Sequence, residues 1–339
     1  MSWAKPMPAN PVVAVAGATG AVGQEMLLVL EQRNFPASIV KALASSRSAG
    51  ITVPFKDGEL TVEEMTPESF IGVDIALFSA GGSISEKMRE SVVGAGAVMI
   101  DNSSAFRMEE GVPLVVPEVN PEAALAHSGV ISNPNCSTIQ MVVALSPLHR
   151  VAPIKRVVVS TYQAASGAGA KAMAELYTQA QQFLNNEPLT IEKFAHQLAF
   201  NCIPHIDVFL DDACTKEEWK MVVETQKILD PSIVVAANCV RVPVLRSHSE
   251  MINVEFHAPI SVEQAREAFE AAPGIIVMDD PATKTYPMPA FTAGTDATYV
   301  GRLRKDPSVE YGLNFWCVAD QLRKGAALNA VQIAELLLP

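Results

Sequence analysis

A glycine-rich turn near the start of the chain constrains the fold more than any other feature of the sequence. Gly17, Gly20 and Gly23 follow a short apolar run, Val12–Ala16, and precede the helically spaced apolar side chains of Ala21–Arg33. Glycines at these positions permit a tight turn and a close approach of the backbone to an anion, and the helix N-terminus offers free N–H groups. This strand, turn and helix predict a dinucleotide-binding unit, although glycines also mark ordinary turns.

The first 135 residues continue the alternation of strands and helices. Further strands are expected at 39–44, 74–79 and 97–101, and a helix near 85–93. Buried parallel strands have short, nearly continuous apolar runs of this kind. The pattern predicts an α/β fold with a doubly wound parallel sheet of the Rossmann type.

The regular alternation of strands and helices ends after Cys136. Helices are expected at 137–148 and 168–184, and strands at 155–161, 233–240, 251–257, 275–279 and 298–304. This half is predicted to form a mixed or antiparallel sheet with helices on one face. The last stretch, 319–338, has the spacing of an amphipathic helix. We therefore expect one domain at 1–135, completed by a C-terminal helix at 319–339, and a second at 136–318.

Composition and charge exclude several classes of protein. The formal net charge is -12 and no Lys/Arg run stands out, which argues against a nucleic-acid partner. The apolar runs are shorter than the ~18 residues of a membrane span, and Met1–Asn10 lacks the apolar core of a signal peptide. The five cysteines contain no CxxC pair, so neither a disulfide framework nor a metal site is expected. The predicted location is cytoplasmic.

The segment after the second expected strand indicates which dinucleotide binds. An NAD site usually has an acidic residue at the end of that strand. Here Ala44–Gly50 contains no carboxylate but has Arg47 and three serines, among them Ser45 and Ser48. These groups suit a 2′-phosphate, so we predict NADP rather than NAD. The alternative is that Arg47 is a solvated loop cation.

Cys136 is the strongest candidate nucleophile. It lies in Ser132–Thr138, after Pro134 and directly before a helical pattern. A helix N-terminus favours the thiolate, whereas the cysteines at 202, 214, 239 and 317 lack such context. Among six histidines, His248 is the best candidate for the acid–base group, because Arg241 lies close to it in the sequence. A structural cysteine and a structural histidine remain the alternatives at this point.

Four ordered segments together resemble the aspartate-semialdehyde dehydrogenase family. They are Gly17–Gly23, Pro134–Ser137, Arg241–His248 and Arg323–Gln332, and the likeness covers nearly the whole chain. The resemblance implies a Rossmann domain, a glyceraldehyde-phosphate-dehydrogenase-like α+β catalytic and dimerisation domain, and a C-terminal helix that packs back onto the first domain. It also implies a homodimer, with tetramers in some relatives.

The resemblance assigns roles to individual residues. Cys136 matches the nucleophile, His248 the acid–base group, and Gln163 a residue that positions the thiol and the substrate. Four residues match substrate and phosphate contacts: Arg241 for the substrate carboxylate, Glu217 for its ammonium group, and Arg107 and Lys220 for phosphate. Glu218 is adjacent to Glu217, so that choice stays open. The alternative interpretations, which do not use the resemblance, are a solvated helix face for Glu217 and Lys220, a loop-closing contact for Arg107, and an ordinary buried amide for Gln163.

Cofactor contacts follow from the same resemblance. The predicted NADP-binding residues are Gly17, Thr19, Gly20, Ala21, Val22, Gly23, Ser45, Arg47, Ser48, Ser79, Gly81, Ser166, Gly167 and Asn314.

The implied reaction is the reversible reductive dephosphorylation of 4-phospho-L-aspartate to L-aspartate 4-semialdehyde through a Cys136 thioester. The semialdehyde supplies the synthesis of threonine and methionine, and that of lysine through diaminopimelate. Three rivals are another thiol-dependent reductase of acyl phosphates, such as N-acetyl-glutamyl-phosphate reductase, a catalytically silent relative, and an NADP-binding regulatory module. Cys136 and His248 are both present, which argues against the silent relative, and a regulatory module leaves the second half of the chain unexplained.

Overall fold

A computed structural model describes residues 5–339, and the chain divides into two compact units. The first unit comprises Met1–Asn135 and Ala326–Pro339, and the second comprises Cys136–Gly325. Residues 1–4, part of the stretch that lacks a signal-peptide pattern, lie outside the described residues.

The first unit is built on a seven-stranded sheet of order β3-β4-β2-β1-β5-β6-β7. All neighbouring strands are parallel except β3 and β4, which form an antiparallel hairpin that the sequence patterns did not predict. The strands are β1 (Val12–Ala16), β2 (Ile39–Ala44), β3 (Thr52–Phe55), β4 (Gly58–Glu64), β5 (Ile75–Phe78), β6 (Val98–Asp101) and β7 (Val130–Ser132). The helices are α1 (Ala21–Gln32), α2 (Gly82–Gly94) and α8 (Leu328–Leu336), with short turns η1 (Ser46–Ser48), η2 (Pro67–Phe70) and η3 (Pro121–Ala126).

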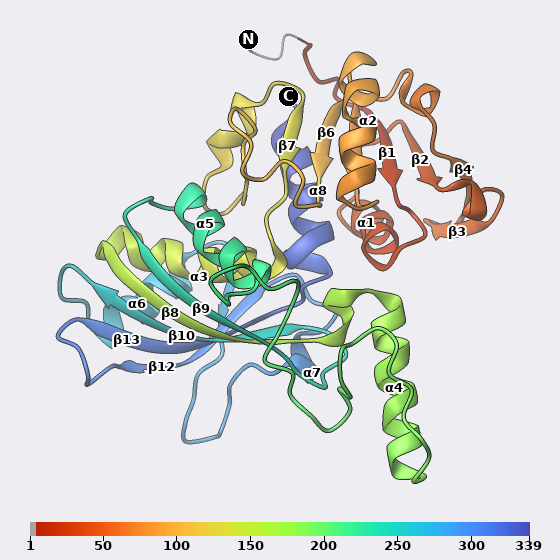
Figure 1. The fold of residues 1–339 in the computed structure, drawn as a ribbon. Helices are drawn as coiled ribbons and strands as arrows, with labels where there is room; N and C mark the ends of the chain where they lie inside the picture. Colours follow the sequence, from red (N-terminus) through yellow and green to blue (C-terminus); the bar gives the residue numbers. More distant parts are fainter. Residues whose placement is uncertain (1–4) are drawn as a thin grey trace. The chain divides into compact units, whose positions relative to one another are not determined.

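Helices cover both faces of this sheet. Helices α1 and α8 lie on one face and α2 on the other (Figure 1). Apolar side chains of α1 and α8 pack with Val13 and Val15 of β1, and Met88 and Val92 of α2 pack with Phe78. Because the chain runs outward from β1 in both directions, the carboxyl ends of β1, β2 and β5 form the edge at which doubly wound sheets bind ligands.

The second unit contains a six-stranded mixed sheet of order β11-β12-β13-β10-β8-β9. Its strands are β8 (Ile154–Gln163), β9 (Val234–Arg241), β10 (His248–Phe256), β11 (Ile275–Val277), β12 (Thr298–Lys305) and β13 (Gly312–Ala319). Its helices are α3 (Cys136–Val151), α4 (Ala170–Leu184), α5 (Lys216–Ile228), α6 (Val262–Ala271) and α7 (Pro289–Thr292), with the turn η4 (Ala165–Ala168). Apolar residues of α3, α5 and α6 form one core with one face of the sheet, whereas α4 extends away from it (Figure 1).

The C-terminal helix begins later than the amphipathic pattern predicted. Ala319 ends β13, and a π-helical turn, η5 (Arg323–Ala327), leads into α8 at Leu328. Asp320 explains the break: its buried carboxylate accepts hydrogen bonds from the backbone N–H groups of Leu322 and Gly294 and from the Arg246 side chain. The expected helix 319–339 is therefore wrong at its start, and the segment that returns to the first unit begins at Ala326.

Candidate active site

Strand register brings three of the predicted residues together at one edge of the second sheet. The parallel pairing of β8 with β9 places Gln163 opposite Arg241. The antiparallel pairing of β8 with β10 places Tyr162 opposite Ser249, so Gln163 ends β8 where His248 begins β10. Gln163, Arg241 and His248 are all buried, and they form a row of polar side chains across the three strands, called the polar row below.

Cys136 lies in the same unit, as the first residue of α3, and it is partly exposed. Its thiol interacts electrostatically with the Arg241 guanidinium. A nearby cation and the N-terminus of a helix both stabilise a thiolate. The backbone also packs closely here, because a Cβ added to Gly325 would lie 2.9 Å from Cys136 Cβ.

The other cysteines lack this environment. Cys239 and Cys317 are buried, and burial raises the pKa of both thiols. Cys214 is exposed, but the neighbouring Asp212 raises its thiol pKa. A raised pKa keeps a thiol protonated and weakly nucleophilic.

His248 is fully buried, and its protonation state follows from its contacts. Its Nδ1 accepts a hydrogen bond of 3.0 Å from the Ala164 backbone N–H. Burial and then the charge of Arg241 hold the pKa of His248 well below its usual value. The ring is therefore neutral at pH 7, with its proton on Nε2. Nε2 has no hydrogen-bond partner among the described residues, and a Cβ at Gly167 would lie only 3.1 Å from it.

Arg241 is held beside this imidazole by the backbone. Its Nη1 donates to the Ala164 carbonyl over 2.6 Å, the same residue whose N–H bonds His248. Burial lowers the pKa of the guanidinium, and the negative charge of Glu217 opposes that effect. A guanidinium remains charged after such a shift because its usual pKa is so high, so Arg241 supplies a fixed, desolvated cation.

The structure distinguishes between the two adjacent glutamates of α5. Glu217 is buried and accepts hydrogen bonds from Gln163 Nε2 and from Lys220 Nζ, each over 3.1 Å. Glu218 instead caps the helix, accepting from the Thr215 backbone N–H over 2.7 Å. Only Glu217 therefore belongs to the polar row.

Lys220 is engaged by two acids. Its Nζ lies 2.7 Å from Asp207 and 3.1 Å from Glu217. Burial lowers the pKa of this ammonium group, but the two carboxylates outweigh it, so the net shift is upward. Lys220 is thus charged at neutral pH and already partly neutralised by its neighbours.

Gln321 is a site residue that the sequence patterns missed. It is buried, donates to Ser166 Oγ, and accepts a hydrogen bond of 2.7 Å from the Ser247 backbone N–H. A Cβ at Gly325 would also contact its Cβ at 3.2 Å. Gln321 thus connects the turn η4 to the residue that precedes His248. Its only signal in the sequence is its place just before Arg323–Gln332.

The predicted residues of the first unit lie at the carboxyl ends of its central strands. The turn at 17–20 joins β1 to α1, Arg47 lies in the turn that follows β2, and Ser79 and Gly81 follow β5. Gly17 has φ +88°, and a Cβ on Gly23 would lie 2.1 Å from the Gly17 carbonyl oxygen. Only glycine permits this close contact between turn and helix, which leaves the turn backbone open to a ligand.

Arg107 and Asn314 complete the set of predicted residues. Arg107 is buried in the first unit, in the loop after β6, and its Nη2 donates to the Asn102 carbonyl over 2.9 Å. Asn314 pairs with Asn253 in the middle of the second sheet and bonds its side chain. Because side chains alternate along a strand, Asn314 points to the face opposite His248. The structure therefore does not bring Asn314 to the polar row, whereas Ser166 and Gly167 do lie beside it.

Comparisons with known proteins agree with this architecture. Residues 12–127 match the semialdehyde dehydrogenase NAD-binding domain, and residues 145–324 match the semialdehyde dehydrogenase dimerisation domain. The first unit is thus a nicotinamide-dinucleotide-binding domain. Among the described residues, no helix has both the length and the apolar character needed to cross a membrane.

Several relatives match over nearly the whole chain. The chain is 55% identical over 331 residues to the aspartate-semialdehyde dehydrogenase of Aquifex aeolicus, covering 96% of this chain and 97% of that protein. The crystal structure of the Vibrio cholerae aspartate semialdehyde dehydrogenase II complexed with ASA has a TM-score of 0.95 and 48% identity, over 97% of this chain and 98% of that one. The Candida albicans enzyme, solved with NADP, has a TM-score of 0.75 and 26% identity, over 97% and 98%. The chain therefore belongs to the aspartate-semialdehyde dehydrogenase family of oxidoreductases.

Proposed function

We propose that the chain catalyses the reversible, NADP-dependent and phosphate-dependent conversion of L-aspartate 4-semialdehyde to 4-phospho-L-aspartate. The reductive direction would supply the semialdehyde for lysine, threonine and methionine synthesis, in the cytoplasm. One observation carries the proposal: Cys136 begins α3 beside the Arg241 cation, in the unit that also contains the neutral His248.

The first step is attack of the Cys136 thiolate on the aldehyde carbon, which forms a hemithioacetal. Arg241 and the N-terminus of α3 keep the sulfur ionised, so no separate base is needed for the thiol. His248 presents Nε2–H as a donor, because the Ala164 N–H occupies Nδ1. That N–H donates a hydrogen bond to the oxyanion of the tetrahedral adduct and stabilises it, and the proton stays on Nε2.

The substrate's own charges match the polar row. Arg241 binds the α-carboxylate through its planar fork. Glu217 binds the α-ammonium group, while Gln163 holds its Oε1 and Lys220 its Oε2. An N-acetylated substrate has no ammonium group and would leave the buried Glu217 charge without that partner, which disfavours the N-acetyl-glutamyl-phosphate reductase alternative. The V. cholerae relative complexed with ASA supports the same substrate class.

Acyl transfer to phosphate completes the oxidative direction. A nicotinamide bound in the first unit would supply the hydride acceptor, and loss of hydride from the oxyanion form of the adduct would leave a thioester on Cys136 with no further proton to remove. A phosphate oxygen then attacks the thioester carbonyl and the Cys136 thiolate leaves, releasing 4-phospho-L-aspartate. We assign phosphate binding to Arg107 in the first unit and to Lys220 in the second, whose ammonium group also pairs with Asp207 and Glu217.

Several features of the first unit support NADP as the cofactor. The turn at Gly17–Gly23 leaves room for a pyrophosphate at the N-terminus of α1. Arg47 is exposed and has no salt-bridge partner in the described part of the chain, and Ser45 and Ser48 flank it. Thr19, Ala21 and Val22 share the same turn and helix start, and the C. albicans relative was solved with NADP.

Replacing Arg47 with alanine is expected to weaken NADP binding roughly 10- to 100-fold, the loss of one charge-assisted hydrogen bond. NAD has no 2′-phosphate, so its affinity should change little. Isothermal titration of both nucleotides measures the difference, and Lys56→Ala, which removes an exposed cation elsewhere in this unit, is the control. Equal losses for NADP and NAD in Arg47→Ala would remove this residue from the 2′-phosphate site.

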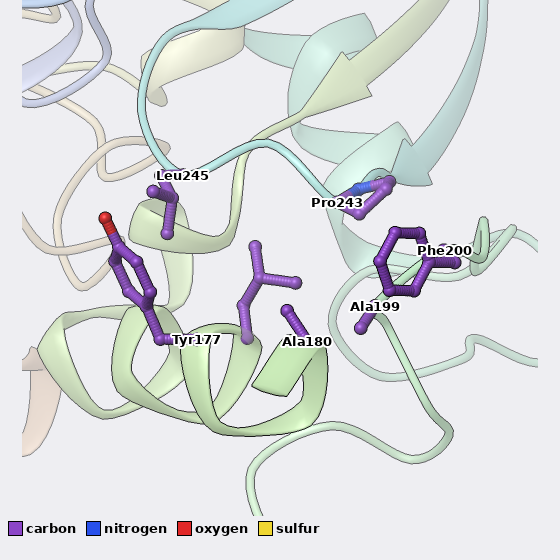
Figure 2. Close-up of a pocket in the computed structure, with 7 residues that line it drawn as sticks. Tyr177, Ala180, Ala199, Phe200, Pro243 and Leu245 are labelled. Atoms are coloured by element: carbon purple, nitrogen blue, oxygen red, sulfur yellow. The ribbon is translucent and has the colours of Figure 1, made fainter. Parts of the chain in front are cut away.

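An apolar surface in the second unit is the proposed contact of a homodimer. Figure 2 shows a pocket between α4 and the loop at 199–200, lined by Tyr177, Ala180, Phe200, Pro243 and Leu245 among others, with a volume of about 240 Å³. Tyr177 and Phe200 are each 60% exposed. Contiguous exposed apolar surface marks interaction sites, and these residues lie within the match to the dimerisation domain, so a second copy of the chain is the proposed occupant.

Phe200→Asp is expected to convert the dimer to a monomer, because it places a charge in the buried centre of the contact. Sedimentation equilibrium at micromolar concentrations measures the molecular mass. Ile71→Asp changes a side chain that is 69% exposed in the other unit and should remain dimeric. A dimeric Phe200→Asp protein would place the contact on another surface.

The test of the proposed function is NADPH formation by the purified chain with NADP⁺ and L-aspartate 4-semialdehyde, with and without phosphate. Turnover is expected only when phosphate is present. N-acetyl-glutamate semialdehyde serves as the competing substrate, and preference for it would reject the substrate assignment.

A further inference from the structure

We infer that three asparagines of the first unit form a hydrogen-bonded chain of side-chain amides that positions Arg107 for phosphate. The inference rests on the phosphate role proposed for Arg107. Asn102 lies in the loop after β6, Asn133 directly follows β7, and Asn329 lies in the first turn of α8. Asn133 and Asn329 are fully buried.

The links of this chain run in one direction. Asn329 Nδ2 donates to Asn133 Oδ1 over 2.6 Å, and Asn133 Nδ2 donates to Asn102 Oδ1 over 2.7 Å. The backbone carbonyl of Asn102 then accepts the hydrogen bond of 2.9 Å from Arg107 Nη2. The C-terminal helix is thereby connected to the guanidinium through three carboxamides and one peptide group.

Further bonds hold the two buried amides in place. Asn133 Nδ2 also donates to the Ala326 carbonyl over 3.2 Å, and its backbone N–H donates to the Asp101 carbonyl over 2.8 Å. Asn329 Nδ2 also donates to the Val115 carbonyl over 3.0 Å. Both donor positions of each amide are therefore used, which fixes the orientation of Asn133 and Asn329.

The opposite side of the Arg107 loop is held separately. The buried Asp101 carboxyl group accepts hydrogen bonds from Ser85 Oγ over 2.6 Å and from Ser103 Oγ over 2.5 Å. With this side anchored on β6 and α2, the amide chain controls the remaining freedom of the Asn102 peptide. A guanidinium binds phosphate through paired N–H groups whose direction matters, so a shift of the Asn102 carbonyl would misdirect Arg107. These asparagines are positioning residues.

Asn329→Ala tests the inference in the phosphate-dependent assay. The expected result is a KM for phosphate at least about tenfold higher, from one lost buried link. The kcat at saturating phosphate and the KM for L-aspartate 4-semialdehyde should stay within about threefold of the wild type. An unchanged KM for phosphate would overturn the inference.

Asn120→Ala is the matched control. Asn120 holds the same chain segment as Asn329, accepting from the Val116 N–H over 2.9 Å and donating to the Leu114 carbonyl over 3.0 Å. Both variants lose side-chain hydrogen bonds to the segment 114–116 and should lower Tm to a similar extent. Only Asn329→Ala should raise the KM for phosphate. An equal rise in Asn120→Ala would show that general destabilisation causes the increase and would contradict the inference.

A second variant and a double variant keep the outcome decisive. Asn102→Ala removes only the side chain that accepts the hydrogen bond from Asn133, at a half-buried position. It should raise the KM for phosphate in the same way, and it serves as the test if Asn329→Ala does not fold. In an Arg107→Lys background, Asn329→Ala should add no further increase, because both changes act on one contact. Independent, multiplicative increases would contradict the inference.

Failure of the proposed function gives a different result. Absence of phosphate-dependent turnover in the wild type would reject the proposed function. An unchanged KM for phosphate in Arg107→Lys would reject both the assigned role of Arg107 and this inference.

Discussion

Replacement of Cys136 by alanine is expected to reduce phosphate-dependent NADPH formation by at least about 10⁴-fold, because the acyl group then has no sulfur on which to be carried. The side chain begins α3 and is partly exposed, so the change removes little packing. Steady-state rates with L-aspartate 4-semialdehyde measure the loss. Mass spectrometry of wild-type protein mixed with semialdehyde and NADP⁺, without phosphate, should detect an acyl adduct on the peptide that contains residue 136.

Two controls separate chemistry from folding in this experiment. The affinity for NADP⁺ should be unchanged in Cys136→Ala, because the glycine turn lies in the other unit. Cys202→Ala removes an exposed thiol and should retain wild-type activity. Substantial residual turnover in Cys136→Ala would rule out a covalent route through this residue.

Arg241→Lys is expected to lower kcat/KM for the semialdehyde by roughly 100-fold, the effect of losing a buried, charge-assisted hydrogen bond to the substrate carboxylate. A lysine keeps the positive charge beside Cys136 but has no planar fork, and it cannot reproduce both the Ala164 contact and two bonds to a carboxylate. Initial-rate measurements at several semialdehyde concentrations separate kcat from KM.

Arg246→Lys is the matched control for this change. Arg246 lies five residues further along the same segment, but its Nε donates to Asp320 over 2.6 Å rather than facing the polar row. A lysine can keep that ion pair, so activity should stay within about threefold of the wild type. If Arg241→Lys retained wild-type kcat/KM, Arg241 would not contact the substrate.

Elements with a strong local pattern were predictable. Val12–Ala16 and Ile39–Ala44 are strands with the expected bounds, and α1 begins at Ala21. Their apolar runs, the glycines between them and the helical spacing that follows are all local signals. The hairpin of β3 and β4 lacks such a signal, since Thr52–Phe55 and Gly58–Glu64 are short and half polar. Residues 319–327 had helical spacing, but hydrogen bonds to the distant Gly294 and Arg246 end the pattern at Asp320.

The same division applies to the candidate site. The segment around Cys136 and the spacing of Arg241 and His248 could be recognised in the sequence. The family resemblance added Gln163 and Glu217 to these candidate site residues. The choice between Glu217 and Glu218 depended on which carboxylate caps α5. Gln321 and the amide chain of Asn102, Asn133 and Asn329 have contacts between residues more than 25 positions apart, and no local pattern records such contacts.

By itself, the sequence determined the dinucleotide-binding turn and the succession of most strands and helices, and it predicted the segment that carries the candidate nucleophile. These depend on neighbours in the chain, through backbone sterics and side-chain periodicity. Only the tertiary structure decided which side chains share a surface. The register of β8 with β9 and β10 places Gln163, Arg241 and His248 in one row and turns Asn314 to the opposite face. A shift of one residue would exchange the two faces, and long-range hydrogen bonding and core packing select that register.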